Sequence, residues 1–416
     1  MTTRDNRTTV LIVEEAVAFG GSIVSTAQLA RSIDPGRVRL IVAIAADPDL
    51  IIPHLVEAEE TTEVVHVRPF LDYQRLERIR TTLRKAAGRM RLPKADVGIN
   101  LFLTLLRTVA NLPWSLRISF LILSRGVDIV QFNNGFGNEG LTLVTRALGR
   151  APVVFMRGYF VGMSGLDRKL LVPRLNACVS VSQYVKDEAV LDGVDPDIIH
   201  VATPPAIPSG KPTVARSEIW ARYGVPPGSR VLSVFGRVIQ WKGHLEFFRA
   251  AKIVAETIDN LAILIVGDES DAGDGYATEV RRFVESNGLA DKVIFTGYVT
   301  DVASMYQASD VVAHTAVLPE PSGRVVFEAM SYGVPLVVSS LGGPKEFIED
   351  GVDGFVVHPE ETETLANRLC TLLSNEELAK EMADRAQRKL RTEYGPERYG
   401  RIVETAYAAA LGRDSL

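Results

Sequence analysis

The sequence has very little cysteine: only Cys178 and Cys370 occur among its 416 residues. Two thiols so far apart in the chain exclude a disulfide scaffold and a cysteine-rich zinc site, and they are typical of a reducing compartment. The first ten residues, MTTRDNRTTV, also lack the apolar core of a secretory signal. We therefore expect a cytoplasmic protein.

Long apolar runs and an excess of positive charge are absent as well. No stretch of about 20 residues is both apolar and uncharged, as a membrane-spanning helix requires. The nearest candidate, from Ile99 to Leu123, is interrupted by Arg107, Pro113 and Arg117. The net charge of −5 argues against nucleic acid as the main partner.

Short runs rich in β-branched residues alternate with helical patterns along the first half of the chain. A turn containing glycine follows the first run, and a helical pattern extends from Ser22 to Ile33. Such alternation indicates a parallel sheet whose strands are joined by crossover helices. The strands predicted in this half are Val10–Val13, Val38–Ile44, Val64–Val67, Asp128–Phe132, Pro152–Met156 and Ala177–Val181.

A segment rich in proline, serine and glycine, Thr203–Pro212, interrupts this alternation as a linker does. The alternation then restarts with LSVFG, AILIVG, VIFTG, DVVAHT, PLVVSS and GFVV, and ends in a helical tail. We therefore predict two α/β domains, over 1–207 and 208–392, followed by a terminal helix over 393–416. Ligands of open parallel sheets bind beyond the carboxyl ends of the strands, so we expect the two domains to face a binding cleft.

The first strand of the second half ends in GRVIQWKGH, where Arg237 and Lys242 follow Gly236 within six residues. Two cations beside the start of a helix suit a diphosphate, and ordinary surface charge is the alternative. The second strand ends at Gly267, and the spacing of the acids after it does not match a calcium-binding EF-hand loop. Tyr298 follows the third strand, where a planar base would find backbone contacts.

Two glutamates flank a predicted helix start after the fourth strand, in PEPSGRVVFEAM. Glu320 lies in the loop, and the backbone N–H groups of Ser322 and Gly323 at the helix N-terminus favour an anion. Glu328 lies on the second turn in an otherwise apolar stretch, so its carboxylate needs a partner such as a pair of hydroxyls. The alternative is a salt bridge to one of two arginines, Arg237 or Arg324.

These segments also carry a family resemblance. GRVIQWKGH, IVGDE, VIFTGYV, EPSGRVVFEAMSYGVPLV and GGPKEFIEDGVDGFVV resemble, in this order, the second half of the family-four retaining glycosyltransferases, which have the GT-B fold. The match covers about Val231 to Val357. In the first half, Gly20-Gly21 resembles the paired glycines of the family and VSVSQYVKDEAV the segment that closes the first domain. PERYGRIVETAYAAAL resembles the last helix, which in this α/β fold of two Rossmann-like domains crosses back to the first domain.

The resemblance implies a nucleotide-diphospho-sugar donor that binds mainly to the second domain. Arg237 and Lys242 would neutralise the diphosphate, and Glu328 would hold the ribose hydroxyls. Glu320 would contact the donor sugar, which makes it the third member of the catalytic set. The other donor-binding positions that we predict are Gly20, Gly21, Gly236, Gly267, Tyr298, Ser322 and Gly323.

Transfer from a diphosphate requires stabilisation of the charge on the leaving group, which the two cations and the helix N-terminus are placed to supply. The one Asp-x-Asp pair considered, Asp47 and Asp49, lies in the first domain, so we expect a reaction without metal or other cofactor. Retention in this family is thought to proceed on one face of the sugar, and we assign no protein nucleophile.

Two features of the first half depart from the family or compete with it. Arg157 stands where the family often has a histidine: either it contacts the acceptor or the donor sugar in a new role, or that contact is missing. GFGNEG, from Gly135 to Gly140, matches a dinucleotide-binding pattern, but no acid follows at the required distance of about 20 residues. A loop on the acceptor side, with Asn134 bonding sugar hydroxyls, is the interpretation we favour.

The segment 68–126 contains twelve basic and three acidic residues, a net charge of +9. On a helical wheel Leu76, Ile79, Leu83 and Met90 share one face, and basic residues flank it on both sides. Such a helix suits an anionic membrane surface, and the apolar stretch after it suits the interface. The alternative is an amphipathic helix packed on the sheet of the first domain, followed by a buried one.

The sequence therefore predicts a retaining, metal-independent glycosyltransferase on the inner face of the cell membrane. Its acceptor would be a glycan or lipid-linked saccharide of a cell-surface polysaccharide or glycolipid pathway, and nucleic acid would not be a partner. Two alternatives remain: a GT-B nucleotide-sugar epimerase, and a non-catalytic nucleotide-sugar-binding partner at the membrane.

Overall fold

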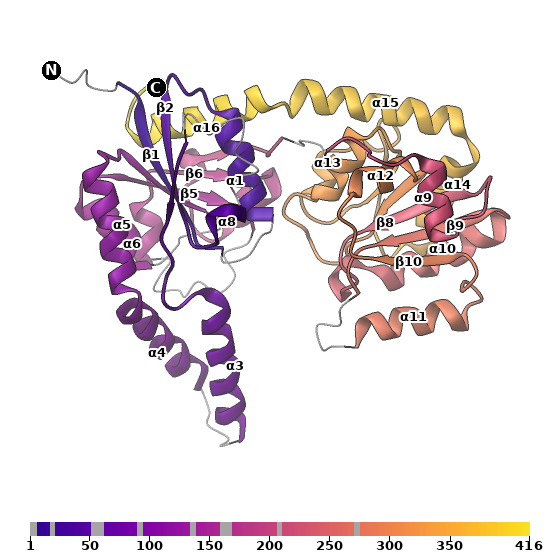
Figure 1. The fold of residues 1–416 in the computed structure, drawn as a ribbon, viewed down its shortest axis with the longest axis horizontal. Coiled ribbons are helices and arrows are strands. Elements are labelled where there is room, and N and C mark those ends of the chain that lie inside the picture. Colours follow the sequence, from indigo (N-terminus) through magenta and orange to yellow (C-terminus); the bar gives the residue numbers. More distant parts are fainter. Residues whose placement is uncertain are drawn as a thin grey trace. The chain divides into compact units, whose positions relative to one another are not determined.

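A computed structural model of the chain describes residues 6–16, 21–50, 62–89, 95–133, 139–158, 169–205, 210–269 and 275–416 (Figure 1). Two predicted site residues, Gly20 and Asn134, lie outside these ranges, as does Met90 of the predicted apolar stripe. The chain forms two compact units. The first comprises Met1–Val181, Val185–Pro204 and Pro396–Leu416, and the second comprises Ser182–Tyr184 and Pro205–Gly395.

The first unit is built on a seven-stranded sheet in the order β3-β2-β1-β4-β5-β6-β7, and all neighbouring strands are parallel. Every residue of β1, β4, β5 and β6 is buried, as expected when helices cover both faces of a parallel sheet. The strands are β1 (Thr8–Glu14), β2 (Val38–Ile44), β3 (Thr62–His66), β4 (Ile129–Asn133), β5 (Ala151–Met156), β6 (Ala177–Ser180) and β7 (Ile199–Val201).

The helices of the first unit connect these strands, except for the last one, which comes from the end of the chain. They are α1 (Gly21–Ser32), α3 (Tyr73–Arg89), α4 (Ala95–Ala110), α5 (Leu112–Ser124), α6 (Glu139–Ala147), α8 (Gln183–Leu191) and α16 (Pro396–Ala410). Short 3-10 turns cover Pro48–Leu50, Val172–Arg174 and Pro196–Ile198.

The terminal helix α16 packs against α1 and against β5, β6 and β7, although more than 190 residues separate it from them in the chain (Figure 1). Its Glu404 accepts a hydrogen bond of 2.8 Å from the backbone N–H of Asp34, just after α1. Its Tyr407 is buried, and the hydroxyl donates to Gln131 of β4 at 2.5 Å. The end of the chain is therefore part of the core of the first unit.

The helix pair α3–α4 corrects part of the prediction for the basic segment. Leu76 and the partly buried Ile79 and Leu83 of α3 pack against α4, where Leu103 is buried. Figure 1 shows the two helices side by side, projecting from the sheet of the first unit. Over the described residues, the apolar stripe of α3 therefore packs on α4 rather than on the sheet. The reason is that periodicity identifies an apolar face without identifying the element that covers it.

The second unit contains a six-stranded parallel sheet in the order β10-β9-β8-β11-β12-β13. Two apolar clusters form its core, one centred on Phe247 and Phe248 and the other on Tyr306 and Phe327. The strands are β8 (Arg230–Phe235), β9 (Leu261–Val266), β10 (Val293–Gly297), β11 (Val311–His314), β12 (Leu336–Ser339) and β13 (Phe355–Val357).

The helices of the second unit follow the strands in the alternation that the sequence predicts. They are α9 (Arg216–Tyr223), α10 (His244–Thr257), α11 (Tyr276–Ser286), α12 (Val302–Gln307), α13 (Arg324–Ser331), α14 (Thr362–Ser374) and α15 (Glu376–Glu393), with 3-10 turns at Gln240–Lys242 and Pro344–Glu346. Two Rossmann-like sheets and a terminal helix that returns to the first confirm the predicted fold class. None of the helices that the structure describes is long and apolar enough to cross a membrane.

Candidate functional site

The strand order of the second unit defines where a ligand can bind. β8 and β11 are neighbours, and the sheet grows outward from them in both directions. In open parallel sheets the crevice beyond the carboxyl ends of two such strands receives the ligand. Lys242 comes from the segment after β8, and His314 and Glu320 come from the end of β11 and the loop that follows.

The Glu320 carboxylate is the centre of the contacts at this point. Nζ of Lys242 donates to both of its oxygens, at 2.9 and 3.1 Å. Nε2 of His314 lies 2.6 Å from Oε2 of Glu320. All three side chains are largely buried. Burial alone would raise the pKa of Glu320, but the hydrogen bond and charge of His314 and the charge of Lys242 lower this pKa to about 2. Glu320 is therefore a fixed carboxylate at neutral pH.

The backbone around Glu320 is held as firmly as its side chain. The carbonyl of Glu320 accepts a hydrogen bond of 2.8 Å from the N–H of Gly343, and Glu320 forms a parallel bridge with Gly342. Gly323, the N-cap of α13, has a φ of 63°, and a Cβ there would lie 2.6 Å from Cγ of Pro344. Only glycine fits this turn, which sets where α13 begins.

Glu328 belongs to a separate group of contacts, on α13. Its Oε2 accepts a hydrogen bond of 2.9 Å from the hydroxyl of Tyr306, and Nε of Arg324 lies 3.1 Å from Oε1. Of the two salt bridges considered from the sequence, the one to Arg324 is therefore formed. The Tyr306 ring stacks on Phe235 at the end of β8, with 3.9 Å between the ring centroids. This contact keeps Glu328 at the same edge of the sheet as Lys242.

The remaining predicted residues of the second unit lie at the same strand ends. The aliphatic chain of Lys242 runs along Gly236, where a Cβ would be 3.6 Å from Cε of Lys242. Arg237 is exposed, and within the described ranges its guanidinium makes no hydrogen bond or ion pair. Gly267 approaches Gly236 so closely that a Cβ would lie 2.0 Å from its carbonyl oxygen, whereas Tyr298 is 78% exposed. Ser322 is partly buried, directly before the N-cap of α13.

A polar network occupies the corresponding switch point of the first unit, between β1 and β4. Glu14, which ends β1, accepts hydrogen bonds from Ser22 and from Nδ2 of Asn133, the latter at 2.7 Å. Oδ1 of Asn133 in turn accepts from Nη2 of Arg157 at 3.3 Å. Gly21 is the first residue of α1, directly before Ser22.

Arg157 is thus directed inward at the end of β5. Its guanidinium lies over the Phe155 ring, 4.5 Å from the ring centroid. Burial lowers the pKa of Arg157, and charge on Tyr399, Glu14 and Tyr407 acts in the opposite direction. Nε and Nη1 have no hydrogen-bond partner in the part of the chain that the structure describes.

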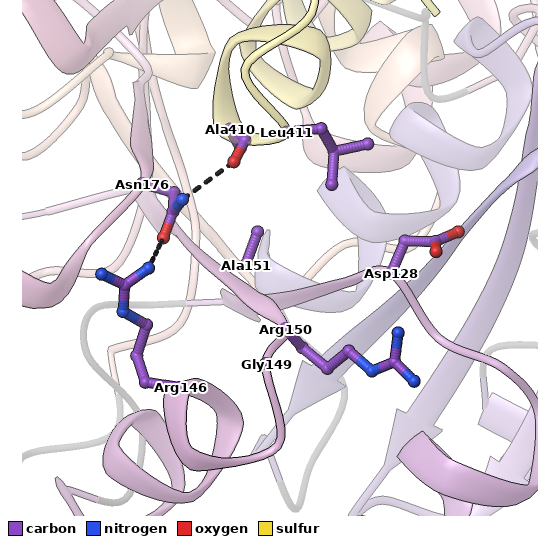
Figure 2. A pocket seen from close by; sticks show the side chains of 8 residues that line it. All are labelled: Asp128, Arg146, Gly149, Arg150, Ala151, Asn176, Ala410 and Leu411. Carbon is purple, nitrogen blue, oxygen red and sulfur yellow. Dashed lines mark hydrogen bonds between the residues drawn. The ribbon is translucent and has the colours of Figure 1, made fainter.

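A further cavity of about 290 Å³ lies in the first unit, at the opposite edge of its sheet. Figure 2 shows Asn176 between Arg146 and the backbone of Ala410: Asn176 accepts from Nη1 of Arg146 and donates to the Ala410 carbonyl, both at 2.8 Å. Asp128 and Arg150 line it just before β4 and β5. The cavity faces the amino ends of the strands, and the Asn176 contact anchors the end of α16.

Three residues of these sites were not predicted from the sequence: His314, Tyr306 and Glu14. His314 is the last residue of the run DVVAH, and a polar side chain at the end of a buried strand is a signal for it. Glu14 ends the first run in the same way. Tyr306 carried no signal, because its hydroxyl reaches Glu328 across 22 residues of sequence. No cluster of histidine, cysteine and acidic residues among the described parts of the chain is suited to a metal ion.

The two Rossmann-like units with their strand-end sites define the GT-B class of folds. Anabaena Alr3699/HepE, solved in complex with UDP, has this fold: it superposes with a TM-score of 0.73 at 19% identity, over 97% of this chain and 100% of that one. Residues 216–389 match the family model of glycosyl transferases group 1. This match confirms the resemblance seen in the second half of the sequence.

Two curated relatives extend the comparison. The chain is 33% identical over 177 residues to alpha-D-kanosaminyltransferase of Streptomyces kanamyceticus, covering 41% of this chain and 43% of the relative. It is 25% identical over 250 residues to the lipopolysaccharide core biosynthesis mannosyltransferase LpcC of Rhizobium leguminosarum bv. viciae, covering 59% and 67%. Matches to curated relatives span 43% to 68% of the relative's own length.

Proposed function

We propose that this protein is a retaining, metal-independent glycosyltransferase that moves a sugar from a nucleotide-diphospho-sugar to an acceptor hydroxyl. One observation carries the proposal: Lys242 and His314 hold the Glu320 carboxylate at the switch point between β8 and β11. This cluster lies within residues 216–389, which match the group 1 family model.

The cations are assigned to the leaving group. As the bond from the anomeric carbon to the diphosphate breaks, negative charge grows on the departing phosphate. Lys242 and the exposed Arg237 stand after the same strand, and the N–H groups at the start of α13 add partial positive charge. The acceptor oxygen forms the new bond on the same face of the sugar, and its proton passes to the departing phosphate. No protein nucleophile takes part.

Glu320 is assigned a positioning role toward the donor sugar. A carboxylate with a pKa of about 2 is a weak proton acceptor at neutral pH, which makes it a poor general base. Its lone pairs remain strong hydrogen-bond acceptors, however, and sugar hydroxyls are suitable donors. Glu328 is assigned to the ribose hydroxyls, with Tyr306 and Arg324 orienting its carboxylate.

The printed names of relatives support the substrate class. Both curated relatives described above are named for the transfer of a sugar, and LpcC is named for lipopolysaccharide core synthesis. The structural neighbour was solved with UDP. We therefore propose a sugar nucleotide as donor, and as acceptor a glycan or lipid-linked saccharide of a cell-surface polysaccharide or glycolipid.

A donor screen tests this function and separates it from its two alternatives. UDP-, GDP- and ADP-sugars are ranked by thermal shift, since a ligand that binds the folded state raises the unfolding midpoint. The best donor is then incubated with the protein, and nucleotide and sugar products are followed. Slow release of the nucleoside diphosphate supports the transferase. An epimerised nucleotide-sugar indicates an epimerase, and binding without any turnover indicates a non-catalytic partner.

Lys242→Met provides the variant for this screen, with Lys252→Met on the exposed side of α10 as its matched control. We expect nucleotide release to fall at least tenfold in the first variant and to remain unchanged in the second. Equal rates in both variants would remove Lys242 from the leaving-group site.

A further inference from the structure

The outer face of α4 and α5 carries an unusual set of exposed apolar side chains. Successive members are three or four residues apart, the spacing that places side chains on one face of a helix. Each is between 52% and 72% exposed. The members of this outer stripe are Phe102, Leu105, Val109, Leu112, Leu116, Phe120 and Leu123.

The stripe is continuous across the junction of the two helices. Only Asn111 separates α4 from α5, and the helical hydrogen bonds continue through it: its N–H donates to Arg107 and its carbonyl accepts from Ser115, both at 2.9 Å. The inner faces of the same helices are occupied, since Leu103 of α4 and Trp114 and Ile118 of α5 are buried. The exposed stripe is thus the second apolar face of helices that already have a core-facing one.

A cationic cavity opens beside the stripe. It has a volume of about 410 Å³ and is lined by Arg68, Arg75 and Arg117 together with Phe70, Pro113 and Trp114. Pro113 and Arg117 come directly after the stripe residues Leu112 and Leu116, and Phe70 is itself exposed.

The walls of this cavity are fixed by buried hydrogen bonds. Asn111 bonds the backbone N–H and carbonyl of Leu71, at 2.8 and 3.0 Å. Nε1 of Trp114 donates to the carbonyl of Val67 at 3.0 Å. The backbone that carries these arginines is therefore held in place by buried hydrogen bonds.

The charge around the stripe is mainly positive. From Val97 to Val127 the chain contains no acidic residue. At the cavity, the buried Asp72 lies 3.8 Å from Arg68 and 3.5 Å from Arg75, so this carboxylate offsets only part of the charge of the three arginines that line the cavity. Arg117 is exposed and makes no ion pair within the described residues.

We propose that the outer stripe of α4–α5 and this cavity form a docking surface for a bilayer containing anionic phospholipids. The apolar side chains enter the interface, and the arginine cavity receives a lipid phosphate. An apolar protein surface bordered by cations is complementary to a bilayer, in which the acyl region is bordered by anionic head groups. A symmetric dimer through the same face would bring the two cationic cavities together, and the like charges would oppose it. The outer stripe lies in the apolar stretch that the sequence predicts for the interface, whereas the predicted stripe of α3 packs on α4.

Vesicle sedimentation with the full chain tests the proposal. Neutral phosphatidylcholine vesicles are compared with vesicles that contain 30% phosphatidylglycerol. We expect binding to the anionic vesicles only, with a bound fraction that decreases at high salt. Leu105→Gln combined with Leu116→Gln should reduce vesicle affinity at least tenfold. Arg117→Gln alone should reduce it severalfold, because it removes the unpaired guanidinium of the cavity.

The matched control combines Leu143→Gln and Leu191→Gln, two other exposed leucines of the same unit. This variant should bind as the wild type does, and unchanged thermal midpoints would exclude misfolding in all variants. Equal binding by stripe and control variants would overturn the proposal. So would a dimer in sedimentation velocity that the stripe variant dissociates, without any vesicle binding. Neither measurement involves sugar transfer, so the outcome is independent of the proposed function.

Discussion

Nε2 of His314 lies 2.6 Å from Oε2 of Glu320, and Lys242 holds the same carboxylate from the other side. The three residues come from two neighbouring strand ends and are 6 to 78 positions apart in the sequence. Nδ1 of His314 is buried without a hydrogen-bond partner among the described residues, so among them the imidazole hydrogen-bonds only to Glu320. His314 is therefore a positioning residue for the carboxylate.

Replacing His314 by alanine should lower kcat with little change in KM. A hydrogen bond to a charged group contributes about 1.5–3 kcal/mol, and the loss of this energy in the transition state corresponds to a decrease in kcat of roughly 10- to 150-fold. His314→Gln, whose amide can donate to the same oxygen, should recover part of the rate. Because burial then raises the pKa of Glu320 with less to oppose it, the acidic limb of the pH–rate profile should move to higher pH in His314→Ala.

The His314 variants are compared by steady-state kinetics across pH, together with their thermal midpoints. An alanine variant with wild-type kcat and an unmoved acidic limb would show that the histidine only fills space.

Glu320→Gln should flatten the pH dependence of stability on the acid side. The folded pKa of Glu320, about 2, lies below the ordinary value of 4.5. The ionised Glu320 carboxylate therefore contributes fully to the free energy of unfolding above about pH 4.5, and this contribution is lost as the pH falls toward 2. Between pH 6 and pH 3 the wild type should lose about 2 kcal/mol more unfolding free energy than the variant. Urea titrations at several pH values measure this difference, and parallel curves would mean that Glu320 is not held as a carboxylate.

Glu328→Ala should weaken nucleotide-sugar binding at least tenfold, since a hydrogen-bonded carboxylate for the ribose is lost. Tyr306→Phe is the informative companion, because it removes only the hydroxyl that supports Glu328. We expect Tyr306→Phe to change affinity severalfold at most. Calorimetric titration gives both values. Wild-type affinity in Glu328→Ala would leave the carboxylate a purely structural partner of Tyr306 and Arg324.

Gly400→Ala should destabilise the first unit through its terminal helix. A Cβ at this position of α16 would lie 1.8 Å from the carbonyl oxygen of Ser32 at the end of α1, so the two helices must separate. Overpacking of this kind costs about 1–3 kcal/mol. Gly140→Ala on α6, where a Cβ meets nothing within 4 Å, is the control and should not destabilise. Thermal unfolding compares them, and equal midpoints would contradict the close approach of α16 to α1.

The sequence predicts the fold well because buried parallel strands are read directly from apolar runs. The run Val38–Ile44 coincides with β2 at both ends. β7 is missed because it has three residues and only one of them is buried, too little for a pattern. For α3 the apolar face is predicted correctly, but its partner is not, since the helix packs on α4.

The candidate site is predicted in part for the same physical reason. Lys242 and Glu320 are identified because residues at the carboxyl ends of parallel strands share one edge of the sheet. The ion pair between Lys242 and Glu320 is not predicted from the sequence. It depends on which strands are neighbours in the sheet, and β8 and β11 are neighbours although they are not consecutive in the chain. The pairing of Arg324 with Glu328 follows from their separation of four residues on one helix.

The most direct test of the account is a crystal structure with the nucleotide-sugar that gives the largest thermal shift. We predict diphosphate oxygens within about 3.2 Å of Arg237 and Lys242, a distance for charge-assisted hydrogen bonds. We also predict ribose hydroxyls on Glu328 and hydroxyls of the transferred sugar on Glu320. A ligand bound elsewhere, with these four side chains directed away from it, would contradict the account.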